Sequence, residues 1–116
     1  MRADAAATPR AYGHYMNRTY AVVWSENGTL ASGRLDSFAD RFELDGRGQR
    51  LSIPFVELLG ASIARGSADR LRGLPVLELG RKAAAPVRIA SLEGTAALHE
   101  LFDQLERAGA GVRSAA

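Results

Sequence analysis

The hydrophobic rhythm of this sequence changes near residue 94, and that change restricts the possible folds more than any other feature. From Tyr20 onward, short apolar runs alternate with polar residues at a period of two, and turn residues separate the runs every eight to twelve positions. That pattern is typical of the strands of a sandwich or barrel. After residue 94 the apolar residues recur at helical spacing, at Leu98, Leu101, Phe102 and Leu105. The sequence therefore predicts a β-rich domain that ends in one amphipathic helix.

The turn residues divide the β-rich part into seven expected strands. The first covers residues 20–24 and precedes Asn27-Gly28, which favours a tight hairpin because both residues tolerate positive φ. Pro54 restricts the fourth strand to an edge or to a strand end, since proline has no amide hydrogen to donate. A helix is expected over 96–108, with Thr95 as its N-cap and Gly109 at its end. The remaining strands are expected at 29–36, 41–44, 51–55, 60–65, 74–79 and 86–90.

Length and composition favour one domain. A chain of 116 residues can bury roughly two-thirds of its unfolded surface, which is enough for one core. Residues 1–18 have no sustained period and predict a flexible arm, residues 19–109 the domain, and residues 110–116 a disordered tail. The chain has no cysteine, and no apolar run approaches the ~20 residues that cross a bilayer. Both features favour a cytoplasmic location.

Seven short strands, mostly in hairpins, followed by a terminal helix, resemble the pleckstrin-homology-like (PH-like) barrel, including its small bacterial and GRAM-like versions. The resemblance covers about residues 20–108 and depends on the element order, on Leu51-Ser52-Ile53-Pro54-Phe55 before the fifth strand, and on the terminal apolar stripe. It implies a mainly β fold, a seven-stranded, two-sheet, partly open barrel capped by one C-terminal α-helix. Members of the family that bind phosphoinositides carry a basic cluster across the first two strands. Glu26 and Asp36 interrupt that stretch here, so inositol-lipid binding is not expected.

Residues for catalysis are not visible in the sequence. The two histidines, His14 and His99, are far apart, and without cysteine they offer no metal-ligand spacing. The serines lack a G-x-S-x-G context, and no phosphate-cradling glycine loop is present. The carboxylates of the terminal helix are expected to face solvent, with Asp103 and Arg107 forming an ion pair one turn apart. We therefore expect no catalytic residue, metal site or cofactor, and a protein that is not an enzyme.

One asymmetry of charge lies between residues 61 and 90, where six basic residues stand against two acidic ones. If the fold gathers them, they form a patch that attracts anions, since arginine matches carboxylate and phosphate geometry. In the other interpretation they only decorate hairpin loops and protect sheet edges. The six residues are Arg65, Arg70, Arg72, Arg81, Lys82 and Arg88.

The function that these features favour is a non-enzymatic interaction module. It would recognise a protein segment or an anionic small ligand through loops and a strand edge, or associate with a second copy. The alternative is peripheral binding to an anionic membrane or a nucleic acid through the basic 61–90 region. The folded body is formally neutral outside a basic N-terminal arm, which weakens the nucleic-acid interpretation because phosphate binders concentrate cations. A small hydrolase or isomerase is a third interpretation and requires carboxylates buried in a pocket.

Overall fold

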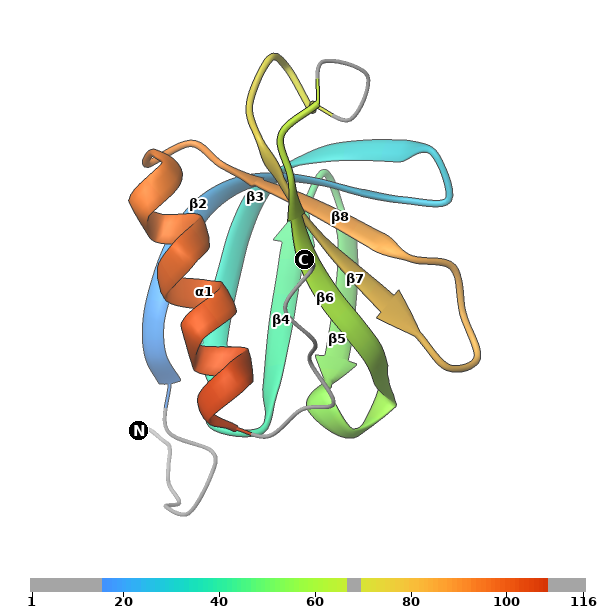
Figure 1. Cartoon of the computed structure of the whole chain (residues 1–116). Coiled ribbons are helices and arrows are strands. Elements are labelled where there is room, and N and C mark those ends of the chain that lie inside the picture. Colours follow the sequence, from blue (N-terminus) through green and yellow to red (C-terminus); the bar gives the residue numbers. More distant parts are fainter. Residues whose placement is uncertain (1–15, 67–69, 109–116) are drawn as a thin grey trace, which may run out of the picture.

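The computed structural model describes residues 16–66 and 70–108 of the chain (Figure 1). These residues form one antiparallel sheet of seven strands that curls into a half-barrel, and one helix follows the last strand. The mainly β fold with a C-terminal helix, predicted from the change in rhythm, is thereby confirmed.

All seven expected strands are present, with their ends displaced by a few residues. A short 3-10 turn, η2 (Phe55–Glu57), joins the fourth strand to the fifth. The terminal helix is α1 (Thr95–Arg107). The strands are β2 (Met16–Glu26), β3 (Thr29–Phe38), β4 (Arg41–Gly46), β5 (Gln49–Pro54), β6 (Leu58–Ala64), β7 (Val76–Arg81) and β8 (Val87–Ser91).

Strand β2 connects the two halves of the barrel. The strand order is β5-β4-β3-β2-β8-β7-β6. β2 pairs with β3 along its length and with β8 over residues 22–26, so the two expected sheets are continuous through this strand. β5 and β6 are the two edges of the sheet and are not hydrogen-bonded neighbours. The barrel is therefore partly open between them.

The start of β2 and the start of α1 differ from the sequence prediction. β2 begins at Met16, so residues 16–18, which were predicted to belong to the arm, are part of a strand. The rest of that arm, the tail and Gly109 lie outside the described residues. The prediction of Thr95 as N-cap is wrong, because Gly94 caps the helix without a side-chain hydrogen bond. Gly94 has φ 110°, which costs glycine little, and it turns the chain into the helix one residue earlier.

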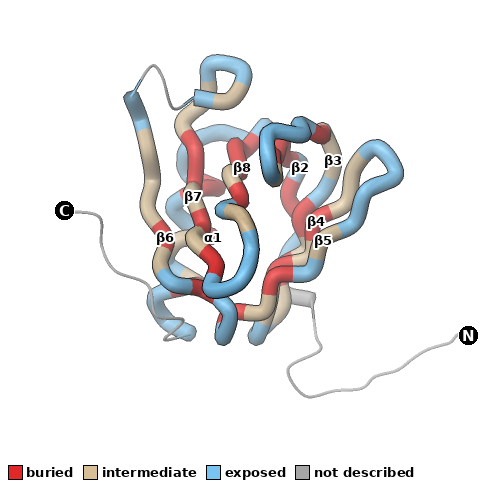
Figure 2. Tube along the Cα trace, turned by 90° about the vertical axis from the view of Figure 1, so that its right-hand side faces the viewer, coloured by how far each residue is buried: buried red, intermediate tan, exposed pale blue. Residues whose placement is uncertain are grey.

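The core lies between the curled sheet and α1 (Figure 2). Leu98, Leu101 and Leu105 are at most 1% exposed, and Phe102 is half-buried at the margin of the core. α1 contacts β6, β7 and β8. An isolated helix of this length is marginal in water. Burial of each leucine contributes about 1.5–3 kcal/mol, so packing is what stabilises α1.

The β3–β4 side of the barrel is fixed by a close approach of backbones. A Cβ atom on Gly33 would lie 1.8 Å from the carbonyl oxygen of Asp45, and one on Gly46 would lie 2.6 Å from that of Ser32. The Trp24 indole donates a hydrogen bond to the same Asp45 oxygen at 3.4 Å. Only glycine at position 33 allows β4 to pass so close to β3.

Candidate functional site

Five of the six basic residues predicted as a patch lie at the two ends of β7, and the sixth, Arg88, lies on β8 opposite the middle of β7. Arg65, Arg70 and Arg72 lie at the β6–β7 connection, whereas Arg81 and Lys82 lie where β7 ends. β7 has six residues, which at ~3.3 Å per residue separates the two groups by roughly 20 Å. The structure does not bring the six side chains to one place.

Most of these basic side chains also have local partners. Arg65 Nη2 lies 2.8 Å from His99 Nε2, and Arg70 donates to the Gly73 carbonyl oxygen at 2.7 Å. Arg88 lies opposite Glu78 in the register of β8 and β7. Arg72 and Lys82 are exposed. This distribution favours the interpretation that the charged side chains lie at hairpin ends without forming a common binding surface.

Arg81 has a structural role that the charge count did not reveal. Its side chain is only 6% exposed; it forms an ion pair with Glu26 at the end of β2 and donates to the Ala85 carbonyl oxygen at 2.7 Å. A buried cation requires such a partner, because desolvation of an unpaired charge is costly. This pair lies at the β2–β3 hairpin end of the barrel and removes Arg81 from any anion-binding surface.

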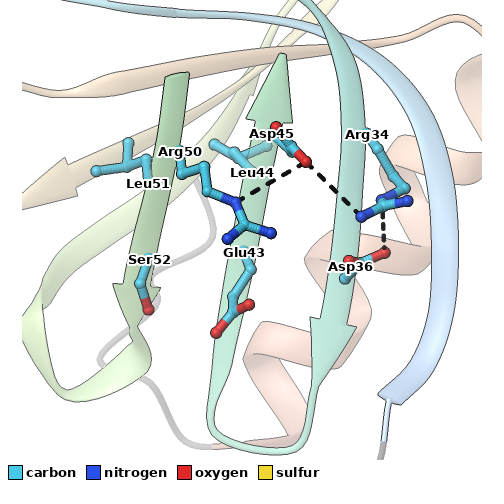
Figure 3. A pocket seen from close by; sticks show the side chains of 8 residues that line it. All are labelled: Arg34, Asp36, Glu43, Leu44, Asp45, Arg50, Leu51 and Ser52. Carbon is cyan, nitrogen blue, oxygen red and sulfur yellow. Dashed lines mark ion pairs between the residues drawn. The ribbon is translucent and has the colours of Figure 1, made fainter. Parts of the chain in front are cut away.

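The outward face of β3, β4 and β5 carries a network of ion pairs around a hollow of about 310 Å³ (Figure 3). Arg34 lies 3.4 Å from Asp36 and 3.7 Å from Asp45, measured between nitrogen and carboxylate oxygen. Arg50 lies 4.0 Å from Asp45. Exposed pairs of this kind contribute little to stability. The side chains of the two paired carboxylates, Asp36 and Asp45, are 17% and 40% exposed.

The described residues contain no group of three or more histidine or acidic side chains suited to a metal ion. Within the same residues, no helix is long and apolar enough to cross a membrane. The expected Asp103–Arg107 pair is not among the ion pairs of the described part of the chain. A pair on an exposed helix surface is worth only a few tenths of a kcal/mol, so it does not fix the two side chains.

The free edge at β6 differs from the other strands in its chemistry. β6 reads Leu-Leu-Gly-Ala-Ser-Ile-Ala and has neither a charge nor a proline. Among the described residues it pairs with β7 alone. Val56 and Leu59, just before and within this edge, are 79% and 63% exposed. Exposed apolar side chains therefore lie beside an edge that has no partner strand within residues 16–66 and 70–108.

A hollow of about 400 Å³ lies on the outward side of β6 and β7. Its cause is a pair of glycines, Gly60 and Gly80, which face each other in the strand register. A Cβ on Gly60 would meet nothing within 4 Å, and one on Gly80 would approach no atom closer than 3.8 Å. The space is therefore open. Leu59, Ala61, Ser62, Glu78 and Pro86 complete its lining.

The sequence analysis predicted that an exposed strand edge would bind a protein segment, but it did not identify which edge. A signal for β6 exists in the uncharged run 58–64. The hollow had no signal of its own, because the register that aligns Gly60 with Gly80 includes a bulge between Leu58 and Gly60. Strand register depends on such irregularities, which sequence patterns do not show.

Comparison with known proteins identifies the fold only. No family model and no curated protein matches the chain. Among solved structures 37 chains match. One is the C-terminal domain of an unknown protein from Leishmania infantum, with a TM-score of 0.63 and 15% identity, covering 79% of this chain and 84% of that one. At this identity the similarity shows a shared fold.

Proposed function

We propose that this protein is a non-enzymatic interaction module that binds an extended segment of another protein as an added strand on β6. The observation that carries the proposal is the open, uncharged edge of that strand. We also propose that the scaffold is a PH-like barrel. The strand order and the terminal helix support this second proposal.

A strand edge that is left free is a liability for a folded protein. An exposed edge presents unpaired amide and carbonyl groups that pair with any available strand, and proteins protect such edges with charges, prolines or bulges. β6 has a bulge at its start but no charge or proline in its length. A partner strand would satisfy its backbone groups, as in binding by β-augmentation.

The side chains around β6 indicate what the partner segment contains. The hollow over Gly60 and Gly80 accepts an apolar side chain, and the exposed Leu59 lies beside it. The exposed charges of Glu57 and Arg65 lie at opposite ends of β6. Opposite charges on the partner would fix its direction. The proposed partner is therefore an extended segment with a central apolar residue, a basic residue near Glu57 and an acidic one near Arg65.

The alternatives have weaker support in the geometry. Charge-driven binding to a membrane, a nucleic acid or an anionic small ligand requires cations that converge, and the basic residues of 61–90 diverge along β7. Self-association through two β6 edges remains a distinct outcome. It predicts a mass that doubles with concentration in sedimentation experiments, whereas the proposal predicts a monomer.

The experiment selects phage-displayed random heptapeptides on the immobilised full chain. The proposal predicts peptides with an apolar centre that bind the wild type at micromolar Kd, typical of small interfaces. Gly60→Val fills the hollow, and Leu59→Lys places a charge on the edge. Each should weaken the binding of the selected peptides about tenfold or more, since burial of an apolar side chain contributes about 1.5–3 kcal/mol.

Ser52→Lys on β5 is the matched control, because it adds the same charge to an exposed position of the other edge strand. It should leave peptide affinity unchanged. A rise in salt to the physiological range should weaken binding only slightly, because it screens the charge pairs at Glu57 and Arg65 but not the backbone hydrogen bonds or apolar contacts. If no peptide is selected, or if Ser52→Lys weakens binding as much as Leu59→Lys, the proposal is wrong.

A further inference from the structure

A second pocket lies between α1 and the strands β2 and β3, away from the β6 edge. Its volume is about 430 Å³. All seven residues that line it carry polar side-chain groups, whereas only Ser62 and Glu78 do so in the hollow on β6. They are Arg18, Tyr20, Ser37, Glu100, Asp103, Gln104 and Arg107.

Ser37, on β3, contributes an unsatisfied group to this pocket. The residue is 0% exposed, and its Oγ is the one buried side-chain polar atom of the described residues that has no hydrogen-bond partner. Buried polar atoms almost always have a partner, so an orphan requires an explanation. A ligand that enters the pocket and displaces the neighbouring side chains could supply the missing hydrogen bond.

Several lining groups are already engaged with one another. Arg18 forms ion pairs with Glu100 and Glu93, the latter at 2.8 Å. The Tyr20 hydroxyl donates to Glu100 Oε1 at 3.0 Å. The guanidinium of Arg18 also covers the Tyr20 ring, 4.4 Å from its centroid. These contacts form one wall, and they leave no aromatic face for stacking by a sugar.

The groups that remain available have opposite charges. Within the described part of the chain, Asp103 and Arg107 form no ion pair, and both are exposed. The Gln104 amide nitrogen donates to the Phe38 carbonyl oxygen at 2.8 Å, which leaves its amide oxygen as an acceptor. The pocket thus offers one anion, one cation and two neutral polar groups.

We infer that this pocket binds a small zwitterion of the α-amino-acid type. Its ammonium would bind the Asp103 carboxylate, and its carboxylate would bind the Arg107 guanidinium, which is suited to bidentate pairing. The ligand's side chain would reach the Ser37 hydroxyl and the Gln104 amide oxygen. The two arginines and two carboxylates of the lining balance, so neither a net anion nor a net cation is favoured over a dipolar molecule.

The test adds the common L-amino acids one at a time, at millimolar concentration, to the full chain, with glucose and inorganic phosphate as further probes. Amide NMR shifts locate binding, and calorimetry measures Kd. At least one amino acid should shift residues of β3 and α1 around this pocket. Asp103→Asn and Arg107→Gln should each weaken it about tenfold or more, the effect of losing a hydrogen bond to a charged group.

Glu106→Gln, an exposed change on the same helix outside the pocket, is the matched control and should leave Kd unchanged. Ser37→Ala should weaken the ligand but raise the melting temperature of the free protein, because it removes an unsatisfied buried group. The inference is overturned if no amino acid binds, if only glucose or phosphate binds, if Glu106→Gln weakens binding equally, or if Ser37→Ala lowers the melting temperature. None of these results bears on the β6 proposal, whose residues lie elsewhere.

Discussion

The two edge strands of the sheet, β5 and β6, differ in the way they face solvent. β5 carries Arg50, which is exposed, and it ends at Pro54. β6 has no such residue and presents Leu59 and a glycine-lined hollow instead. Charge and proline are the usual means by which an edge avoids pairing with other chains. The difference supports the proposal that a partner strand binds at β6 rather than at β5.

The two halves of the sheet are also held in different ways. The β3–β4 side depends on direct backbone contact at Gly33, while the β6–β8 side is covered by the leucines of α1. β2 belongs to both halves, because it pairs with β3 on one side and with β8 on the other. The proposed binding edge at β6 lies on the helix-covered half, whereas the close backbone approach at Gly33 lies on the other.

The largest expected difference in stability is between alanine substitutions of two glycines, Gly33 on one half of the sheet and Gly60 on the other. Gly33→Ala would place a methyl group against the Asp45 backbone, and backbone cannot yield as a flexible side chain can. We expect a loss of more than about 4 kcal/mol in the free energy of unfolding, or no folding. Gly60→Ala, with open space around it, should change stability by less than about 1 kcal/mol. Urea denaturation measures both, and equal losses would contradict the close approach at Gly33.

A smaller loss is expected where the helix covers its half of the sheet. Leu101→Ala removes a fully buried side chain and should lower the free energy of unfolding by about 2–5 kcal/mol. Leu59→Ala, on the exposed edge, should lower it by less than about 0.5 kcal/mol. A comparable loss for Leu59→Ala in thermal denaturation would mean that this side chain is packed rather than available to a partner.

The next effect compares a buried ion pair with an exposed one. Glu26→Ala leaves the buried Arg81 without its carboxylate and should cost about 3 kcal/mol, the low end for buried pairs because Glu26 is partly exposed. Arg34→Ala, in the surface network beside β5, should cost less than about 1 kcal/mol. Denaturation curves of the two variants would contradict this account if they coincide.

The smallest expected effect on stability is a pH dependence that comes from Tyr20 on β2, whose hydroxyl contacts α1. Burial, and then the hydrogen bond to Glu100, raise the pKa of Tyr20 above its ordinary value of 10.0. The stabilisation is present below pH 10 and is lost as the pH rises through the raised pKa, because the unfolded chain releases the proton first. Tyrosinate absorbance should show one of the three tyrosines ionising late, and Tyr20→Phe should abolish that phase. Simultaneous ionisation of all three would contradict the contact.

The fold was predictable because its signals are local and repeated. Asn27-Gly28 and the stripe Leu98–Leu105 each specify an element within a few residues. The site was less predictable because it depends on distance and register. The sequence prediction placed Arg81 and Arg65 in one patch. In the structure Arg81 is buried against Glu26, and Arg65 lies at the other end of the β6–β7 hairpin. Whether the Ser37 hydroxyl finds a hydrogen-bond partner depends on which residues of α1 lie next to it. The periodicity of the sequence does not predict those contacts.

The most direct test of the difference between the edges is amide hydrogen exchange of the full chain, with and without a peptide selected on it. Added backbone hydrogen bonds protect the amides that make them. The account predicts that slowed exchange on peptide binding is confined to β6 and its flanking turns, with β5 unchanged. Protection that appears on β5 or at the hairpin ends, with β6 unaffected, would contradict it.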